Sequence, residues 1–399
     1  MPVNYQDIQG QIKKMGEMEP QRLQALNALR VQAVALLAAH NTNLDALQDW
    51  VKQAATKNQN LRCAVPVAEP LMAHFPPPPM PPQVVILAAD GSQINPSRHD
   101  SVPFGVINVG AFRMAPGSGQ APAESVSSEL ITGDDLYAPN GGAIGEEVVA
   151  LRRDLREREM LAVLAAAEHE DSPGVLVAAL TDGPLEPFVR EPFNRPDLSD
   201  LYMDYLKALR AVVNPFTATA GYVDKPRSDL LVRLLELVTL AESGRLDRAG
   251  HERSLPGVTD AGLLADVLRP GERSAIFALQ SRTAQTFTDE IAIHFFYMNV
   301  GREGSPSLVR VEVPRWVAEN AALVGMLHAV LIEQCHVLGN RPYPYTLHRS
   351  HEVAVVRFEE KDQLKTMIEM ELRSRGISVD GPSNKQATKD NSGKRARHE

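Results

Sequence analysis

Two short segments of this chain each carry an aspartate directly after a run of apolar residues. Asp90 follows such a run in residues 84–92, Asp182 follows another in residues 175–184, and a glycine comes next in both. A short apolar run bounded by turn residues predicts a buried strand, whose final aspartate would lie at the carboxyl edge of a sheet. Carboxylates are the usual protein ligands of Mg²⁺ and Mn²⁺. The pair therefore predicts a divalent-cation site, although each Asp-Gly is equally typical of a simple turn.

A two-carboxylate metal site usually recruits a third acid, and the segment before the second aspartate supplies candidates. Residues 146–170 are rich in Ala, Leu, Glu and Arg and predict a long helix. Glu157 lies two residues after Leu155 and one turn before Leu161, so it borders the apolar side of this helix. We therefore expect Glu157 to face the edge of the sheet, with Glu159 as the alternative.

A second group of polar and aromatic residues lies near the C-terminus. Residues 343–351 contain two tyrosines, Tyr343 and Tyr345, and two histidines, His348 and His351. Histidine binds metals and exchanges protons near neutral pH, and a tyrosine hydroxyl can hold a phosphate or a water. The alternative interpretation is an aromatic turn that carries surface histidines.

The elements that must position these residues alternate between strand and helix, which predicts a mixed α/β fold. Residues 104–112 are expected to form a strand that pairs with the first as a hairpin, and residues 115–128 a mobile loop. Residues 294–300 and 308–313 predict a pair of strands, and residues 354–356 a short strand.

Composition divides the chain into four parts. Residues 1–62 predict an N-terminal helical region, and residues 63–83 a proline-rich linker. Residues 84–377 would form the main domain, and residues 378–399 a disordered polar tail. The N-terminal helices are expected to form a hairpin packed on the main domain, although their leucine stripe could equally bind a partner.

The overall composition limits the class of protein. The net charge of −9 argues against non-specific coating of nucleic acid, but it leaves room for a local basic groove. Cys63 and Cys335 are too far apart in sequence to suggest a ligand pair, and two free thiols are typical of a reducing compartment. No apolar run has the length of a membrane span. We therefore expect a cytoplasmic protein. The sequence contains no Gly-x4-Gly-Lys-Ser/Thr loop, so the chain is not expected to power its own translocation.

The order of these motifs resembles the NurA nuclease family. Residues 220–228, 269–277 and 310–314 also look like bacterial members, and the resemblance covers roughly residues 84–359. The motifs that carry it are Ala-Asp-Gly-Ser at 89–92, the acidic helix, Asp-Gly-Pro-Leu at 182–185 and Tyr-Pro-x-x-Leu-x-x-x-His at 343–351.

The resemblance implies an RNase H-like mixed sheet core and Mn²⁺-dependent cleavage of DNA, with Mg²⁺ as the alternative metal. It also implies a homodimer that works with a hexameric HerA-type ATPase on DNA ends and single strands. His348 matches no position of the family pattern. The residues that match its site are Asp90, Glu157, Asp182, Tyr343 and His351, and all except Tyr343 are expected to hold the metal.

Two other functions fit the same residues. The chain could be a non-catalytic clamp on DNA ends that regulates an ATPase partner. Alternatively, Asp90 and Asp182 could serve as the acid and base of a sugar hydrolase. Only Trp50 and Trp316 are available for stacking on a sugar, which gives the hydrolase little support.

Overall fold

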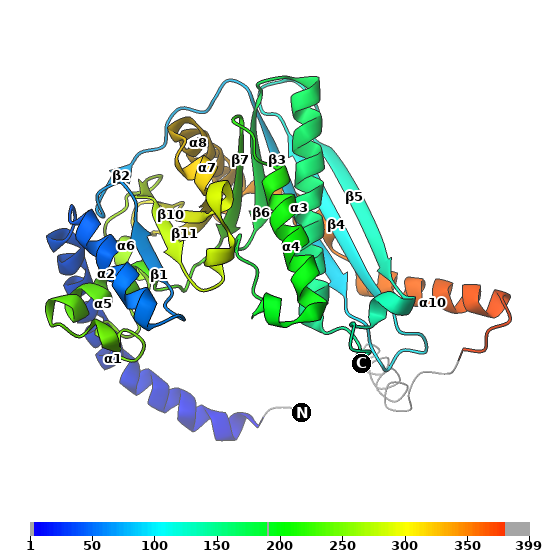
Figure 1. The fold of residues 1–399 in the computed structure, drawn as a ribbon, viewed down its shortest axis with the longest axis horizontal. Coiled ribbons are helices and arrows are strands. Elements are labelled where there is room, and N and C mark those ends of the chain that lie inside the picture. Colours follow the sequence, from blue (N-terminus) through cyan, green and yellow to red (C-terminus); the bar gives the residue numbers. More distant parts are fainter. Residues whose placement is uncertain (1–3, 190, 380–399) are drawn as a thin grey trace. The chain divides into compact units, whose positions relative to one another are not determined.

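The computed structural model describes residues 4–189 and 191–379, which divide into two compact units (Figure 1). The first unit comprises residues 1–79, 183–186 and 221–332, and the second comprises residues 80–182, 187–220 and 333–399. The four-part division drawn from composition stays a prediction, and residues 380–399 of its tail lie outside the described residues. Within the described ranges, no helix combines the length and hydropathy needed to cross a membrane.

The sheet of the second unit has the strand order β7-β6-β3-β4-β5. β3 (Val84–Ile94), β4 (Gly105–Met114) and β5 (Ala123–Ile131) are antiparallel neighbours, whereas β6 (Leu176–Asp182) runs parallel to β3. The unit boundary falls within β7 (Thr217–Val223), after Ala220. In an RNase H-like sheet, three antiparallel strands (here β3, β4 and β5) are followed by a strand (here β6) that lies beside the first of them and runs parallel to it. The expected fold class is therefore confirmed.

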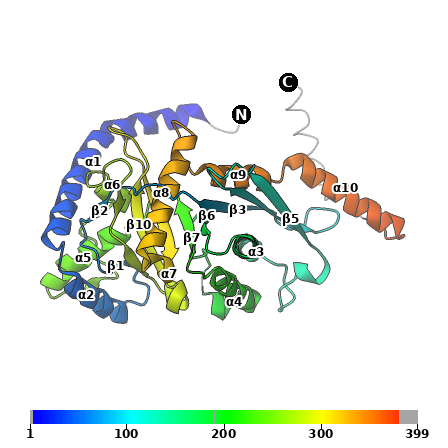
Figure 2. The same cartoon turned by 90° about the horizontal axis from the view of Figure 1, so that it is seen from above.

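Helices cover both faces of this sheet. α3 (Glu146–Asp171) packs on one face with α4 (Pro196–Ala211) beside it, and α9 (Tyr345–Ala354) lies on the other (Figure 2). Because side chains alternate along a strand, the odd-numbered residues Val85, Leu87 and Ala89 of β3 share one buried core with Val149 and Leu161 of α3. The even-numbered residues of β3 face α9, and α10 (Phe358–Ser374) follows.

Three local predictions for this unit were wrong. β3 does not end at Asp90 but continues to Ile94, because β4 pairs with it along its whole second half. Residues 115–128 are only partly a loop, since β5 begins at Ala123 and its hydrogen bonds to β4 need no apolar pattern. The predicted strand at 354–356 is instead the end of helix α9 and the residues that follow it.

The first unit contains a second group of antiparallel strands and the N-terminal helices. α2 (Leu44–Lys57) buries Leu47, Val51 and Ala54 within this unit, so the expected N-terminal helical region is confirmed. α1 (Tyr5–Ala39) and α2 pack on other elements of the unit rather than on each other as the predicted hairpin would. The first half of α1 is exposed. The antiparallel pair predicted at 294–300 and 308–313 is confirmed as β10 and β11. The strands are β1 (Cys63–Pro66), β2 (His74–Phe75), β8 (Arg273–Ser274), β9 (Phe277–Gln280), β10 (Ile293–Asn299) and β11 (Leu308–Pro314), and the helices are α5 (Leu230–Glu242), α6 (Asp260–Leu264), α7 (Arg315–Ala318) and α8 (Ala321–Val337), which continues past the unit boundary.

Candidate active site

The two aspartates lie beside each other on adjacent parallel strands. The β3–β6 register pairs Ala88 with Leu180 and Ala89 with Thr181, so the next step along both strands brings Asp90 opposite Asp182. Parallel neighbours are about 4.8 Å apart and paired residues point to the same face. Asp182 is the exposed last residue of its strand, as predicted, whereas Asp90 lies within β3, where it pairs with Gly110 of β4. The alternation of side chains along the strands therefore predicts both carboxylates on the same face of the sheet.

Helix α9 brings a histidine to Asp90. His351 Nδ1 lies 2.6 Å from Asp90 Oδ2, and Ser92 Oγ donates a hydrogen bond to the carbonyl of Ala354 at 2.5 Å. The helix backbone can come this close because Gly110, opposite Asp90 on β4, has no side chain: a Cβ there would lie 2.5 Å from the Ala354 nitrogen. The segment that could have been an aromatic turn is thus a helix that presents His351 to the first aspartate.

The two histidines of α9 have different surroundings. His348 Nε2 lies 3.6 Å from a carboxylate oxygen of Glu352 on the same helix, and nearly half of its side chain is exposed. His348 therefore contacts a surface residue of its own helix, whereas His351 contacts a residue of the sheet.

Helix α3 brings Glu157 against the other face of β3. Glu157 is 7 % exposed, and a Cβ on Gly91 would lie 2.7 Å from its Oε1. Burial, followed by repulsion from Asp154, raises the pKa of Glu157 well above its usual value, and Asp90 adds to this effect. Glu159 instead pairs with Arg156 at 2.6 Å at the surface. The geometry favours Glu157 over Glu159 as the acidic residue from this helix.

An arginine that the sequence did not single out lies among these acids. Arg153 Nη2 is 2.7 Å from Asp154 Oδ1, and its Nε is 3.5 Å from Glu157 Oε1. Although burial disfavours its charge, Asp154, Glu157 and Asp90 together raise the pKa of the Arg153 guanidinium. Arg153 thus partly neutralises the cluster. Its spacing of four residues from Glu157 was the only signal in the sequence, because i and i+4 lie on one helix face.

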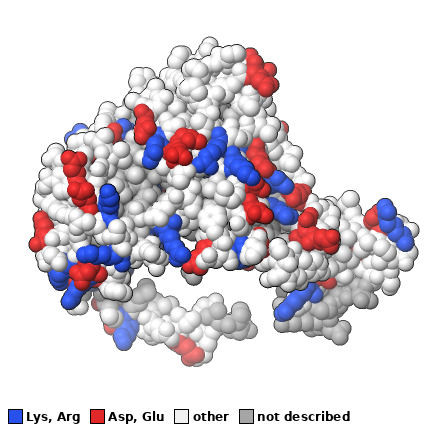
Figure 3. All heavy atoms as spheres, viewed as in Figure 1, with Lys and Arg blue, Asp and Glu red and all other residues white. Residues whose placement is uncertain are grey.

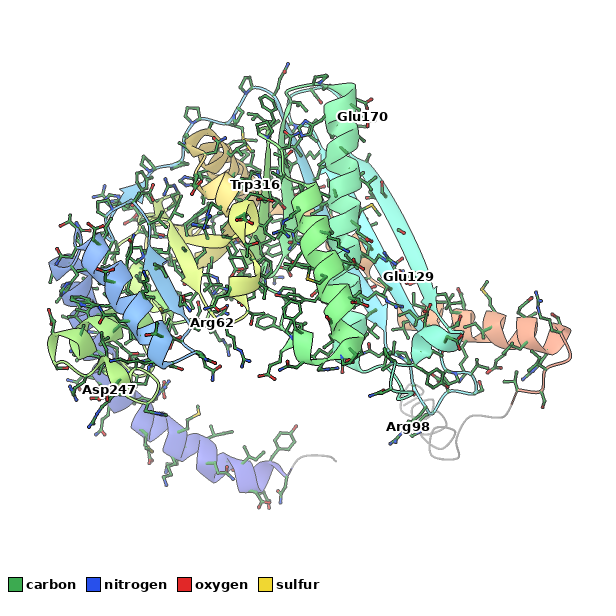
Figure 4. The ribbon with its side chains drawn as sticks, viewed as in Figure 1. Arg62, Arg98, Glu129, Glu170, Asp247 and Trp316 are labelled. Atoms are coloured by element: carbon green, nitrogen blue, oxygen red, sulfur yellow. The ribbon has the colours of Figure 1, made fainter. Side chains whose placement is uncertain are left out.

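Two further arginines of α3 pair with a glutamate at the edge of the sheet. Arg152 and Arg156 both approach Glu129 of β5, which is labelled in Figure 4, at 3.7 and 2.6 Å. Figure 3 correspondingly shows blue and red atoms interspersed over α3 and β5. The positive charges of Arg152 and Arg156 are therefore offset by Glu129 at this edge of the sheet.

The donor types of the site fit a hard divalent cation. Asp90, Glu157 and Asp182 offer carboxylate oxygens, the ligands that Mg²⁺ and Mn²⁺ prefer, and crowded carboxylates gain from a cation between them. Among the described residues, however, no three His, Cys, Asp or Glu side chains are already arranged as a formed coordination shell. Tyr343 is half-buried in the segment just before α9.

Comparison with known proteins gives one family. The model of the NurA domain matches residues 84–356, and no curated protein matches the sequence. The NurA nuclease from Sulfolobus solfataricus is 12 % identical with a TM-score of 0.48, over 91 % of this chain and 97 % of that one. A structure of NurA with manganese is 11 % identical with a TM-score of 0.38, over 74 % of this chain and 90 % of that one. The catalytic domain of human Endonuclease V is 12 % identical with a TM-score of 0.31, over 81 % of this chain and 98 % of that one.

Proposed function

Because this chain belongs to the NurA domain family, we propose that it is a metal-dependent deoxyribonuclease whose site is built on Asp90, Asp182 and Glu157. The observation that carries the proposal is the β3–β6 register, which pairs Ala89 with Thr181, the residues directly before the two aspartates. Glu157 reaches the same strand from α3, next to Asp90, because Gly91 leaves room for its carboxylate.

The protein's own residues would divide the work of hydrolysis. The metal, Mn²⁺ or alternatively Mg²⁺, would lower the pKa of a water and stabilise the oxygen that leaves the phosphodiester. Asp90, Asp182, Glu157 and His351 are the candidate ligands. If Asp90 is ionised, His351 donates its Nδ1 proton to it, which leaves Nε2 on a side chain that is 62 % exposed.

From that position, Nε2 of His351 can bind a metal or exchange a proton with the substrate. Tyr343 is proposed to hold a phosphate oxygen or a water. Arg153, which already pairs with Asp154, would keep the acid cluster partly neutral before the substrate binds.

The finer features of the function also belong to this proposal. We propose that the substrates are DNA ends and single strands, and that a HerA-type hexameric ATPase supplies the motion, since the sequence has no nucleotide-binding loop of its own. A homodimer and a cytoplasmic location complete the proposal. The buried, free Cys63 and Cys335 are consistent with a reducing compartment.

Cleavage of labelled DNA by conservative variants tests the site. Asp90→Asn and Asp182→Asn keep the shape of each side chain but remove the charge, so both should lose Mn²⁺-dependent cleavage of a single-stranded oligonucleotide while remaining folded. Asp204→Asn is the control, because Asp204 pairs with Lys207 at the surface of α4. EDTA should abolish wild-type activity.

Wild-type rates in both site variants would refute the metal assignment. Binding of DNA ends by the wild type with no cleavage in Mn²⁺ would instead favour the non-catalytic clamp.

A further inference from the structure

The loop that follows β6 exposes an aromatic side chain. Phe188 is 88 % exposed, more than any other large apolar side chain in the described part of the chain. Its two neighbours, Pro187 and Val189, are buried, and the Val189 nitrogen donates a hydrogen bond to the Pro187 carbonyl at 2.8 Å. Phe188 therefore lies exposed at the tip of a tight turn, with a buried residue on each side.

Phe188 lines a cavity that shares residues with the acid cluster. The cavity has a volume of about 530 Å³, and its walls include Phe188, Val189, Leu151, Arg153 and Asp154. Two glutamates from the first turn of α3 complete its polar side. Because Arg153 contacts Asp154 and Glu157, the cavity opens beside the carboxylates of the candidate active site. The volume falls within the range of small-ligand pockets.

The chemistry of the lining selects one part of a nucleic acid. Its carboxylates, such as Asp154, would repel a phosphodiester but can accept hydrogen bonds from the amino groups of bases. Phe188 adds a π-face of the kind on which bases of single strands stack. A nucleobase meets both requirements, whereas a phosphate would find only Arg153, which is already paired with Asp154 at 2.7 Å.

We propose that Phe188 is a positioning residue on which one nucleobase of a single-stranded substrate stacks, in the cavity beside the acid cluster. The proposal rests on the proposed nuclease function and specifies the form of DNA that the site accepts. A base that is paired and stacked within a duplex is not free to enter such a cavity. The cavity would thus favour single strands and unpaired ends.

Cleavage kinetics with Mn²⁺ and a short single-stranded oligonucleotide test the proposal. A stacked base contributes binding worth about 5- to 150-fold in affinity, so Phe188→Ala should raise KM by about that factor and leave kcat nearly unchanged. Phe188→Tyr keeps the aromatic face and should behave as the wild type, whereas Phe188→Leu keeps only the apolar volume and should resemble Phe188→Ala. Phe216→Ala is a matched control, because Phe216 is 42 % exposed and is not among the described residues that line the cavity.

Equilibrium binding provides a readout that does not depend on turnover. In EDTA, a series of oligonucleotides that each carry one abasic position at a different place is bound to the protein. The wild type should bind most weakly the oligonucleotide whose abasic position falls in the cavity, whereas Phe188→Ala should bind all members of the series alike. Unchanged KM and unchanged binding in Phe188→Ala would overturn the proposal. A change in molar mass by light scattering, accompanied by parallel losses on single and double strands, would also overturn it, because Phe188 would then be a contact between copies. Failure of the nuclease function itself is distinguishable, since the wild type would then cleave no DNA.

Discussion

Replacing Gly91 with alanine should impair the site without removing any of its charged groups. The added Cβ would lie 2.7 Å from Glu157 Oε1 and 2.5 Å from Arg153 Cγ, whereas ordinary contacts begin at 3.4 Å. The carboxylate must therefore retreat by about 0.7 Å, and misplacing a catalytic group by about 1 Å costs on the order of 100-fold in rate. We expect Gly91→Ala to reduce Mn²⁺-dependent cleavage by about 10- to 100-fold.

The same substitution should have only a limited effect on folding. Overpacking costs about 1–3 kcal/mol, and the lower flexibility of alanine returns about 0.5–1 kcal/mol, so the net loss should be about 0–2.5 kcal/mol. Thermal unfolding with and without Mn²⁺ measures this loss together with any change in metal binding.

Gly16→Ala is the matched control, because a Cβ at that exposed position of α1 meets no atom within 4 Å. A Gly91→Ala variant with wild-type cleavage and the same stabilisation by Mn²⁺ would show that Glu157 is not needed where the structure places it.

Three further predictions follow from single contacts. His351→Ala should lower kcat by about 100-fold or more, as expected for loss of a proton-transfer group, and His348→Ala should not; a more severe effect of His348→Ala in the same assay would reverse the assignment. The buried His328 donates a hydrogen bond to the Gly271 carbonyl, and burial lowers the pKa of its imidazole to about 4. His328 therefore stays neutral in the folded state at pH values between about 4 and 6.5, where the same side chain is protonated in the unfolded chain. The free energy of unfolding should therefore fall by up to about 3 kcal/mol between pH 6.5 and 4, and denaturant titrations of His328→Gln should show a flatter pH profile. Deleting residues 1–20, from the exposed part of α1, should weaken co-purification with a HerA-type ATPase more than cleavage of short single strands; loss of folding on deletion would contradict this.

Sequence patterns correctly predicted the strands and helices in which buried residues recur at regular intervals. The apolar runs before Asp90 and Asp182 are buried strands. Leu161, in the predicted helix of residues 146–170, packs against the sheet, and Glu157 is buried against β3 as its place beside the apolar stripe predicted. Such elements are predictable because the residues that pack into the core recur with the period of the strand or helix. β5 was missed because both of its faces are largely exposed, so only its backbone hydrogen bonds to β4 define it.

The contacts within the site could not be read from local patterns. His351 was singled out by its spacing from Tyr343 in the family pattern, but its contact with Asp90 joins residues 261 positions apart. The helical nature of α9 was obscured by its aromatic residues, although the buried Leu347, Ser350 and Ala354 have helical spacing. Arg153 is one of many charged residues on α3, and only the fold shows that it pairs with Asp154.

The long sequence separation between Asp90 and His351 has a consequence for protein synthesis. Ribosomes add about 5–20 residues per second, so β3 emerges tens of seconds before α9. During that interval most of the first unit is synthesised, while the face of β3 that carries Asp90 lacks its helix. The histidine can join the aspartate only after residue 351 has been synthesised and α9 has formed. A nascent chain therefore cannot present the full site, and truncated products that end before α9 should be inert toward nearby nucleic acid.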